Sequence, residues 1–199
     1  MATTLFLARH AVHGLVDQVL CGRMPGVHLG DAGRRQATLL ARRLESTGLA
    51  AVYTSPLERA QDTAAIIALG AGHDPVVDQA LVEIDFGTWT GHRFDALQDD
   101  PNWRHWNAER GTARPPGGEP MAEVQRRVMH WAEAAAEQHP DAAIAAVSHG
   151  DVIKAMVAAV LGLPLDHYAR FEIGPASLTT IILWPGGGAK LVRMNEAPA

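Results

Sequence analysis

The chain has 199 residues, of which 47% are hydrophobic and 20% are charged, and its formal net charge is −5. This length supplies enough apolar side chains for one well-packed domain. The acidic balance argues against a nucleic-acid-binding protein, because the binding face of such a protein carries a basic excess.

The single cysteine, Cys21, excludes an internal disulfide and fits a reducing compartment. Residues 1–4 lack the basic and apolar segments of a secretory signal, and no apolar run reaches the roughly 20 residues that cross a bilayer. We therefore expect a cytoplasmic protein without a membrane partner.

The first predicted element is a strand over residues 5–10, an apolar run that ends abruptly in Arg9 and His10. A continuous apolar run is typical of a strand buried on both faces, as in a parallel sheet covered by helices. The following loop has no clear period, and loops in this position tend to form the wall of a site. Asp31 then predicts the N-cap of a helix over residues 34–47, and residues 50–54 predict a second strand.

Residues 55–58, Ser-Pro-Leu-Glu, predict the start of the next helix. The serine would cap the helix, the proline would take its first position, and the glutamate would complete a capping box. Arg59 follows in the first turn, where a cation opposes the positive end of the helix dipole. It is either a surface arginine paired with Glu58 or Asp62, or part of an anion site at the helix N-terminus.

The middle of the chain predicts short elements separated by glycine- and proline-rich segments. Residues 76–77 predict an edge strand, and residues 92–114, rich in Trp, His and Arg, predict an irregular or short-helical flap. After the break at residues 115–118, Pro120 opens a helix. Its apolar stripe predicts core rather than cofactor contacts and consists of Val124, Val128, Trp131 and Ala135.

Residues 142–150 repeat the plan of the first strand, because an apolar run again ends in polar residues, here Ser148, His149 and Gly150. A helix follows from Asp151 to about residue 160. Residues 170–173 and 178–184 predict a pair of strands that turns at residues 174–175. Residues 191–192 predict a further short edge strand.

Three stretches thus place candidate residues at one edge of the sheet, because ligands of such sheets bind at the carboxyl ends of the strands. The arginines could donate bidentate hydrogen bonds to an oxyanion. A histidine can act as nucleophile when one ring nitrogen is free and the other is held. This combination is typical of phosphoryl transfer. The residues concerned are Arg9, His10, Arg59 and His149.

Phosphoryl transfer from an ester also needs an acid that protonates the departing alkoxide. A carboxyl group kept protonated by a dry pocket or by neighbouring negative charge could supply this proton. Glu83, just ahead of a glycine break, is the best-placed candidate, and Asp85 is the second.

Taken together, these motifs resemble those of the histidine phosphatases, also called the phosphoglycerate-mutase-like superfamily. The resemblance rests on residues 9–11, 55–64, 83–91, 116–119 and 147–150, which occur in the order of the family. It implies an α/β fold, a three-layer α/β/α sandwich with a mostly parallel central sheet. It also implies a single domain over residues 1–199, with cap segments at about residues 12–30 and 92–118.

The resemblance also implies the role of each site residue. His10 would become phosphorylated, and Glu83 would protonate the leaving group and then help to activate water. The implied phosphate-binding residues are Arg9, Arg59, His149 and Gly150. The implied substrate-binding residues are His13, Cys21, Gly22, Arg23 and His92. No metal and no cofactor is implied, because the arginines and His149 replace the charge of a metal.

Two residues depart from the pattern of the family. Ala11 stands where the family usually has glycine, so its Cβ either strains a positive φ, at a cost of about 1 kcal/mol, or reshapes the pocket. Val16 stands where the sugar-phosphate enzymes often have asparagine, which leaves open how this loop recognises substrate.

Four functions remain distinct alternatives. The leading one is a phosphatase that hydrolyses small-molecule phosphate monoesters, and the second is a phosphoglycerate-type phosphomutase. The short segment 83–91 and the chain length resemble the phosphatases. A non-catalytic phospholigand-binding protein and a metal-dependent hydrolase that uses His10 and His13 are the others. The expected partner is a small phosphorylated metabolite, with a homodimer left open.

Overall fold

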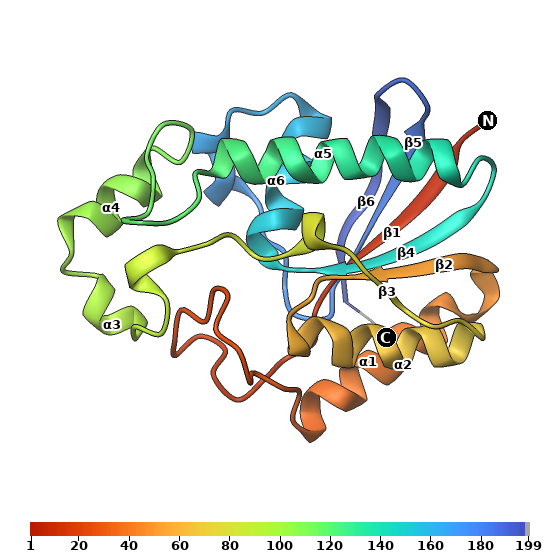
Figure 1. Ribbon diagram of the computed structural model, residues 1–199, viewed down its shortest axis with the longest axis horizontal. Coiled ribbons are helices and arrows are strands. Elements are labelled where there is room, and N and C mark those ends of the chain that lie inside the picture. The colour runs from red at the N-terminus through yellow and green to blue at the C-terminus, as the bar shows by residue number, and fades with distance from the viewer. Residues whose placement is uncertain (198–199) are drawn as a thin grey trace.

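The computed structural model describes residues 1–197 and contains a six-stranded sheet in the order β3-β2-β4-β1-β5-β6 (Figure 1). Strand β5 is antiparallel to both of its neighbours, whereas every other adjacent pair is parallel. The prediction of a mostly parallel α/β sheet is confirmed. The strands are β1 (Thr3–Arg9), β2 (Leu49–Thr54), β3 (Val76–Val77), β4 (Ala143–Ser148), β5 (Leu178–Trp184) and β6 (Gly188–Glu196).

Helices cover both faces of the sheet, with α1 (Asp31–Leu44) and α2 (Glu58–Ala71) on one side and α5 (Met121–Gln138) and α6 (Gly150–Leu161) on the other (Figure 1). Each helix presents an apolar face to the sheet, so the core divides into two clusters. The predicted stripe of α5, which includes Val128, is buried in one of them. The predicted three-layer arrangement is confirmed.

The predicted flap contains two short helices, α3 (Phe94–Leu97) and α4 (Pro101–Ala108), which lie beyond one end of the sheet (Figure 1). Aromatic rings pack closely inside it, and the Trp103 and Trp106 centroids lie 5.5 Å apart. Short 3₁₀ helices link the larger elements. They are Glu45–Thr47, Gln79–Leu81, Gly87–Trp89 and Leu165–Arg170.

Both predicted helix caps are wrong. Helix α1 is capped by Gly30, and Asp31 is already its first helical residue. Helix α2 begins at Glu58 with Leu57 as its N-cap, so Ser55 and Glu58 form no capping box. The reason is tertiary, because the Ser55 hydroxyl bonds His149 at 2.7 Å while the Glu58 carboxylate accepts from the Gly26 amide.

The prediction for the C-terminal strands is partly wrong. Residues 170–173 form no strand, because the chain there leaves a 3₁₀ turn and enters an irregular loop. Strand β5 pairs with β6 instead, across a reversal in which Gly186 and Gly187 adopt positive φ angles of 86° and 88°. The predicted edge at residues 191–192 is the middle of this longer strand.

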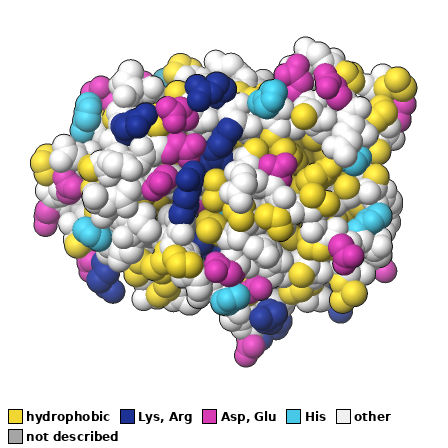
Figure 2. All heavy atoms as spheres, viewed as in Figure 1, with side chains coloured by type: hydrophobic (Ala, Val, Ile, Leu, Met, Phe, Trp, Pro, Cys, Tyr) yellow, Lys and Arg dark blue, Asp and Glu magenta, His cyan; other side chains and the backbone are white. Residues whose placement is uncertain are grey.

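The face drawn in Figure 2 mixes Lys and Arg side chains with Asp and Glu side chains. A row of Lys and Arg side chains on this face has Asp and Glu side chains directly beside it. Such alternation is typical of a surface with paired charges. In residues 1–197, no helix combines the length and the hydropathy needed to cross a membrane.

Candidate active site

Two histidines lie side by side where the neighbouring parallel strands β1 and β4 end. Arg9 and Ser148 are partners in the register of this strand pair, so the residues after them leave the sheet at the same level. The His10 amide also donates to the Ser148 carbonyl at 2.9 Å. As a result, the ring centroids of His10 and His149 lie 5.1 Å apart.

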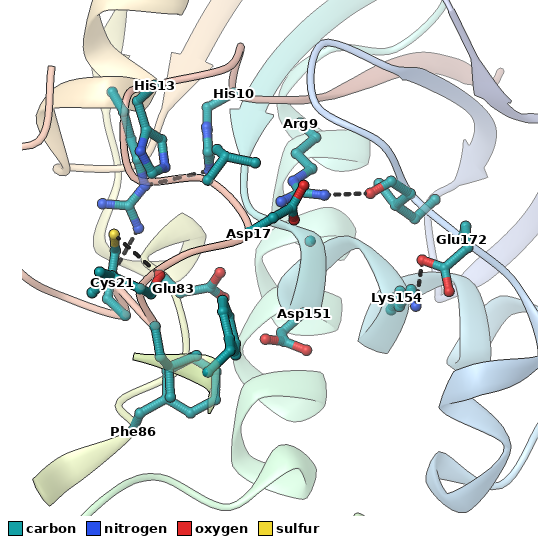
Figure 3. A pocket seen from close by; sticks show the side chains of 18 of the residues that line it. Arg9, His10, His13, Asp17, Cys21, Glu83, Phe86, Asp151, Lys154 and Glu172 are labelled. Atoms are coloured by element: carbon teal, nitrogen blue, oxygen red, sulfur yellow. Dashed lines mark hydrogen bonds and ion pairs between the residues drawn. The ribbon is translucent and has the colours of Figure 1, made fainter. Parts of the chain in front are cut away.

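A pocket of about 170 Å³ opens at this edge of the sheet (Figure 3). Of the residues expected to handle the phosphoryl group, His149 alone does not line it, because this side chain is fully buried behind the wall. The others come from β1, α2, α6 and the segment after the 3₁₀ turn Gln79–Leu81. They are Arg9, His10, Arg59, Glu83 and Gly150.

The ring of His10 is fixed in one orientation. Its Nδ1 lies 2.9 Å from the Ala11 carbonyl oxygen and therefore carries the hydrogen, because a carbonyl can only accept. This leaves Nε2 as a lone pair, to which Arg59 Nε donates at 3.3 Å. Burial, followed by the charges of Arg59 and Arg9, holds the pKa of His10 well below its usual range. His10 is consequently a neutral imidazole with a free Nε2, the form that a nucleophile requires.

Each of the two arginines has one buried donor without a partner among the described residues. Arg59 is 2% exposed and donates to the Gly22 carbonyl at 2.6 Å, while Arg9 donates to the Ile173 carbonyl at 2.7 Å. Arg59 Nη1 and Arg9 Nε are buried, and neither finds an acceptor within residues 1–197. Buried donors normally have partners, so this pair indicates a site that an oxyanion would complete. The alternative of a surface Arg59 paired with Glu58 or Asp62 is wrong.

His149 lies buried behind the pocket wall, next to Arg59. Its Nε2 lies 2.7 Å from the Ser55 hydroxyl, and its Nδ1 lies 3.3 Å from Arg59 Nη2. Since the arginine can only donate, Nδ1 accepts here and Nε2–H donates to Ser55. Burial, together with the charge of Arg59, lowers the pKa of His149 well below its usual range. His149 is also the N-cap of α6, whose dipole adds positive potential at this point.

Glu83 is a buried carboxyl group, with 8% of the residue exposed. Its Oε1 accepts from the Ile84 amide at 2.9 Å, and its Oε2 lies 4.0 Å from His149 Nδ1. Burial raises its pKa to about 8, with a further contribution from the negative charge of Asp151. Glu83 is therefore protonated at neutral pH and can donate a proton.

Asp85, the second candidate for the acid, lies outside the pocket wall. Its side chain is 41% exposed, lies 3.8 Å from Arg23 and accepts from the Gly87 amide at 2.8 Å. Position 87 requires glycine for two reasons. Its φ is 55°, and a Cβ there would collide with the Pro116 carbonyl. Asp85 thus shapes a turn, and the arrangement favours Glu83 as the acid.

The predicted substrate loop divides into residues that face the pocket and residues that do not. His13, Cys21 and Gly22 line it, whereas Arg23 and His92 do not. Arg23 is held by the Glu119 carboxylate at 2.7 Å and by the Glu83 carbonyl at 2.7 Å. His92 is exposed at the start of the flap. The expectation that these two residues contact substrate has no support in this arrangement.

His13 adds a third imidazole to the pocket. Its ring centroid lies 5.4 Å from that of His10, and its Nδ1 accepts from the Leu15 amide at 3.3 Å. Burial, followed by the charges of Arg59 and Arg9, lowers its pKa to about 4. His13 is therefore neutral at physiological pH and carries its hydrogen on Nε2.

The two departures from the family pattern have simple structural accounts. Ala11 does not adopt a positive φ and does not line the pocket, so neither cost expected of its Cβ arises. It is fully buried, and its amide donates to the Thr63 hydroxyl at 3.1 Å. Val16 does line the pocket, next to Asp17, which has a φ of 60°.

Several pocket residues escaped the sequence analysis. Asp151 and Lys154 line the pocket but show only a helical pattern in the sequence, and Ser55, which lies outside the lining and bonds His149, has the pattern of a helix cap. A helical projection from His149 would have placed residues at the start of α6 near the site. Tyr168 and Glu172 come from a segment with no motif, so no local signal identifies them.

Residues 1–197 contain no group of three or more His, Cys, Asp or Glu side chains arranged to hold a metal ion. The neighbouring His10 and His13 have their Nδ1 atoms engaged by backbone groups. The donor set at the pocket is cationic, which suits an anion.

Inorganic phosphate should stabilise the folded protein. At a concentration of about 100 times its Kd, a ligand of the folded state adds about 2.7 kcal/mol, which raises Tm by about 5–10 °C in a chain of this size. Arg59→Met should abolish most of this shift, because it removes one unsatisfied donor and the bond to His10. Differential scanning calorimetry with phosphate and with chloride at equal ionic strength provides the measurement. An equal shift in both salts would contradict a specific anion site.

Comparisons with known proteins agree with this geometry. The family model of the histidine phosphatase superfamily (branch 1) matches residues 5–197. A bifunctional protein of Mycobacterium tuberculosis is 34% identical over 98% of this chain and 54% of its own length, so the chain spans about half the length of the first curated relatives that it matches. Phosphoserine phosphatase 1 of Hydrogenobacter thermophilus is 31% identical over 89% of this chain and 85% of its own length. Further relatives are named probable phosphoglycerate mutase.

Solved structures show the same likeness over nearly the whole chain. A mycobacterial glucosyl-3-phosphoglycerate phosphatase superposes with a TM-score of 0.88 at 28% identity. The match covers 98% of this chain and all of that one.

Proposed function

The chain belongs to the histidine phosphatase superfamily, and we propose from this premise that it is a phosphatase of small-molecule phosphate monoesters. The observation that carries the proposal is the pair of buried guanidinium donors that find no partner within residues 1–197 and belong to Arg9 and Arg59, which line the same pocket as His10 with its free Nε2. Together they form a site for a tetrahedral oxyanion next to a neutral nucleophile. A non-catalytic phospholigand-binding protein would not need this nucleophile or a protonated Glu83.

In the first step, His10 Nε2 attacks phosphorus and the ester P–O bond breaks. Glu83 gives its proton to the departing alkoxide, so the leaving group departs as a neutral alcohol. Arg59 now donates to the lone pair of Nε2, and we propose that a phosphoryl oxygen takes over this donor when substrate binds. Arg9 and the Gly150 end of α6 hold the remaining negative charge, while the neutral His149, behind the pocket wall, accepts from Arg59 and orients it.

In the second step, water attacks phosphorus and the P–N bond to His10 breaks. The Glu83 carboxylate accepts a proton from this water, which restores the starting state. Inorganic phosphate is the product. The cycle uses the chain's own cations in place of a metal.

We propose that residues 12–30 and 92–118 act as a cap over the pocket within a single domain. Two backbone bonds support this role, because the Leu20 amide donates to the His92 carbonyl at 2.8 Å and the Gly91 amide to the Leu20 carbonyl at 2.9 Å. The cap controls how much water reaches the phosphohistidine, which separates a phosphatase from a mutase. We also propose a cytoplasmic location, which we infer from the single cysteine. A homodimer stays a prediction.

Phosphate release should continue undiminished in excess EDTA, because the cationic charge at the site comes from side chains. The measurement is initial velocity with p-nitrophenyl phosphate before and after chelation. A complete loss that a divalent cation restores would favour a metal-dependent hydrolase.

A phosphomutase is the second candidate, because relatives named probable phosphoglycerate mutase match at 34% identity. The two functions share the phosphohistidine and differ in the acceptor. Phosphorus NMR of the chain with 3-phosphoglycerate and its bisphosphate distinguishes inorganic phosphate from a rearranged monoester. We expect inorganic phosphate as the main product.

A further inference from the structure

We propose that Lys154 and Glu172 form a second anion station in the pocket, which selects phosphomonoesters that carry a carboxylate a short distance from the phosphate. The inference rests on the proposed phosphatase function and specifies its substrate class. Both residues line the same pocket as Arg9 and His10, and their ion pair lies at the other end of the view from His13 (Figure 3).

Lys154 is a buried cation whose ammonium group needs an anion. The residue is 6% exposed, and its Nζ lies 4.2 Å from the centroid of the Tyr168 ring. A buried ammonium group is costly unless it is paired. Among residues 1–197, the one carboxylate within ion-pair distance is that of Glu172, at 3.2 Å.

Glu172 is poorly suited to be a permanent partner. Its side chain is 77% exposed, and it makes no hydrogen bond within the described residues other than the one from Lys154. An exposed carboxylate holds a cation weakly, because water competes for both groups. Glu172 shows that a carboxylate fits at this station, and its exposure allows a substrate carboxylate to replace it.

The spacing between the two stations is fixed by the chain. Arg9, a residue of the phosphate site, donates to the Ile173 carbonyl at 2.7 Å. Ile173 follows Glu172, so Arg9 holds the loop that carries Glu172. On the other wall, Gly150 and Lys154 both line the pocket and belong to α6, where four residues rise by about 6 Å. A pocket of about 170 Å³ between them suits a phosphate and a carboxylate joined by a short carbon chain.

The neighbouring acid does not oppose this assignment, because the carboxylate of Asp151 is already engaged by other donors. Arg110 donates to its carboxylate at 3.0 Å, and the Tyr168 hydroxyl donates to the same oxygen. The guanidinium of Arg110 is fixed between two aromatic rings, 3.5 Å from the Trp106 centroid and 3.8 Å from the Tyr168 centroid. Lys154 thus keeps its positive charge available to a ligand.

The test compares two competitive inhibitors of p-nitrophenyl phosphate turnover that differ by one group, 3-phosphoglycerate with a carboxylate and glycerol 3-phosphate with a hydroxymethyl. Their Ki values are measured for the unmodified chain, Lys154→Met, Glu172→Gln and a control, Lys190→Met. Lys190 is exposed on β6, so its substitution removes a lysine charge away from the pocket.

We expect 3-phosphoglycerate to bind about 10- to 100-fold more tightly, the range of a charge-assisted hydrogen bond. Lys154→Met should bring the ratio of Ki values to about one, and Glu172→Gln should increase it, because a competing carboxylate is removed. Lys190→Met should leave it unchanged. A ratio near one in the unmodified chain, or equal losses for both inhibitors in Lys154→Met, would overturn the inference and leave a purely structural ion pair.

Failure of the proposed function would appear differently, as no turnover of p-nitrophenyl phosphate at all. The same two compounds are then titrated by calorimetry, and the ratio of their Kd values replaces the ratio of Ki values. A carboxylate preference that depends on Lys154 would still support the second station in a chain that only binds.

Discussion

His10→Ala should abolish turnover of phosphate monoesters, with a loss on the order of 10⁴-fold or more in kcat. The expected loss is large because, in the proposed mechanism, the free Nε2 of this ring forms the covalent bond in the first step. His13 lies nearby, but its Nε2 carries a hydrogen and cannot attack. Initial velocities with p-nitrophenyl phosphate provide the measurement.

A second readout separates loss of the nucleophile from loss of the fold. The unmodified chain, quenched during turnover of a phosphorus-labelled substrate, should carry a label that is stable in base and labile in acid, as a phosphohistidine is. His10→Ala should carry none and should keep its circular dichroism spectrum. His130→Ala, a matched change at an exposed position of α5, should retain both activity and label. Label on the His10→Ala chain would show that another residue is the nucleophile.

Glu83→Gln should slow alkyl phosphates by about 100- to 1,000-fold and p-nitrophenyl phosphate by less than about 10-fold. An alkoxide is a poor leaving group without a proton, whereas p-nitrophenolate departs readily. The ratio of kcat/KM values for the two esters is the measurement. Asp85→Asn, a change in the neighbouring carboxyl outside the pocket, should leave the ratio unchanged. Equal slowing of both esters by Glu83→Gln would remove Glu83 from the acid role.

The pH profile follows from the raised pKa of Glu83. Because the protonated form is the donor, and because its pKa is about 8, kcat/KM for an alkyl phosphate should be retained below pH 8 and fall as the pH rises above it. The same sign applies to stability, since a carboxyl whose pKa is raised in the folded state contributes fully to folding below its ordinary pKa and loses this contribution progressively as the pH rises from there to about 8. In Glu83→Gln the alkaline fall in activity should disappear.

The sequence predicts the central features of the site because these are local. Arg9 and His10 end one apolar run and His149 ends another, and the strand–helix topology requires such ends to meet. Glu83 was harder, since its burial depends on packing against distant elements. Its position ahead of a glycine break favours Glu83 over Asp85 as the acid, whereas the structural reason is that Glu83 lines the pocket and Asp85 does not.

The errors arise where a tertiary contact competes with a local pattern. Ser55 has the sequence of a capping box, but its hydroxyl is engaged by His149, which lies 94 positions away. Arg23 has the sequence position of a substrate contact, but Glu119 holds it. Residues 170–173 read as a strand, and the side chain of Glu172 instead reaches Lys154. None of these contacts leaves a signal in the neighbouring sequence.

The in-register pairing of Arg9 with Ser148 has a consequence for how the chain tolerates change. The reactive geometry is built into the alignment of two central strands, so a core substitution that slides β1 against β4 by a fraction of an ångström would separate the imidazoles while most of the packing survives. Random variants of these strands should therefore lose turnover well before they lose solubility. A screen for expression alone would retain many inert sequences.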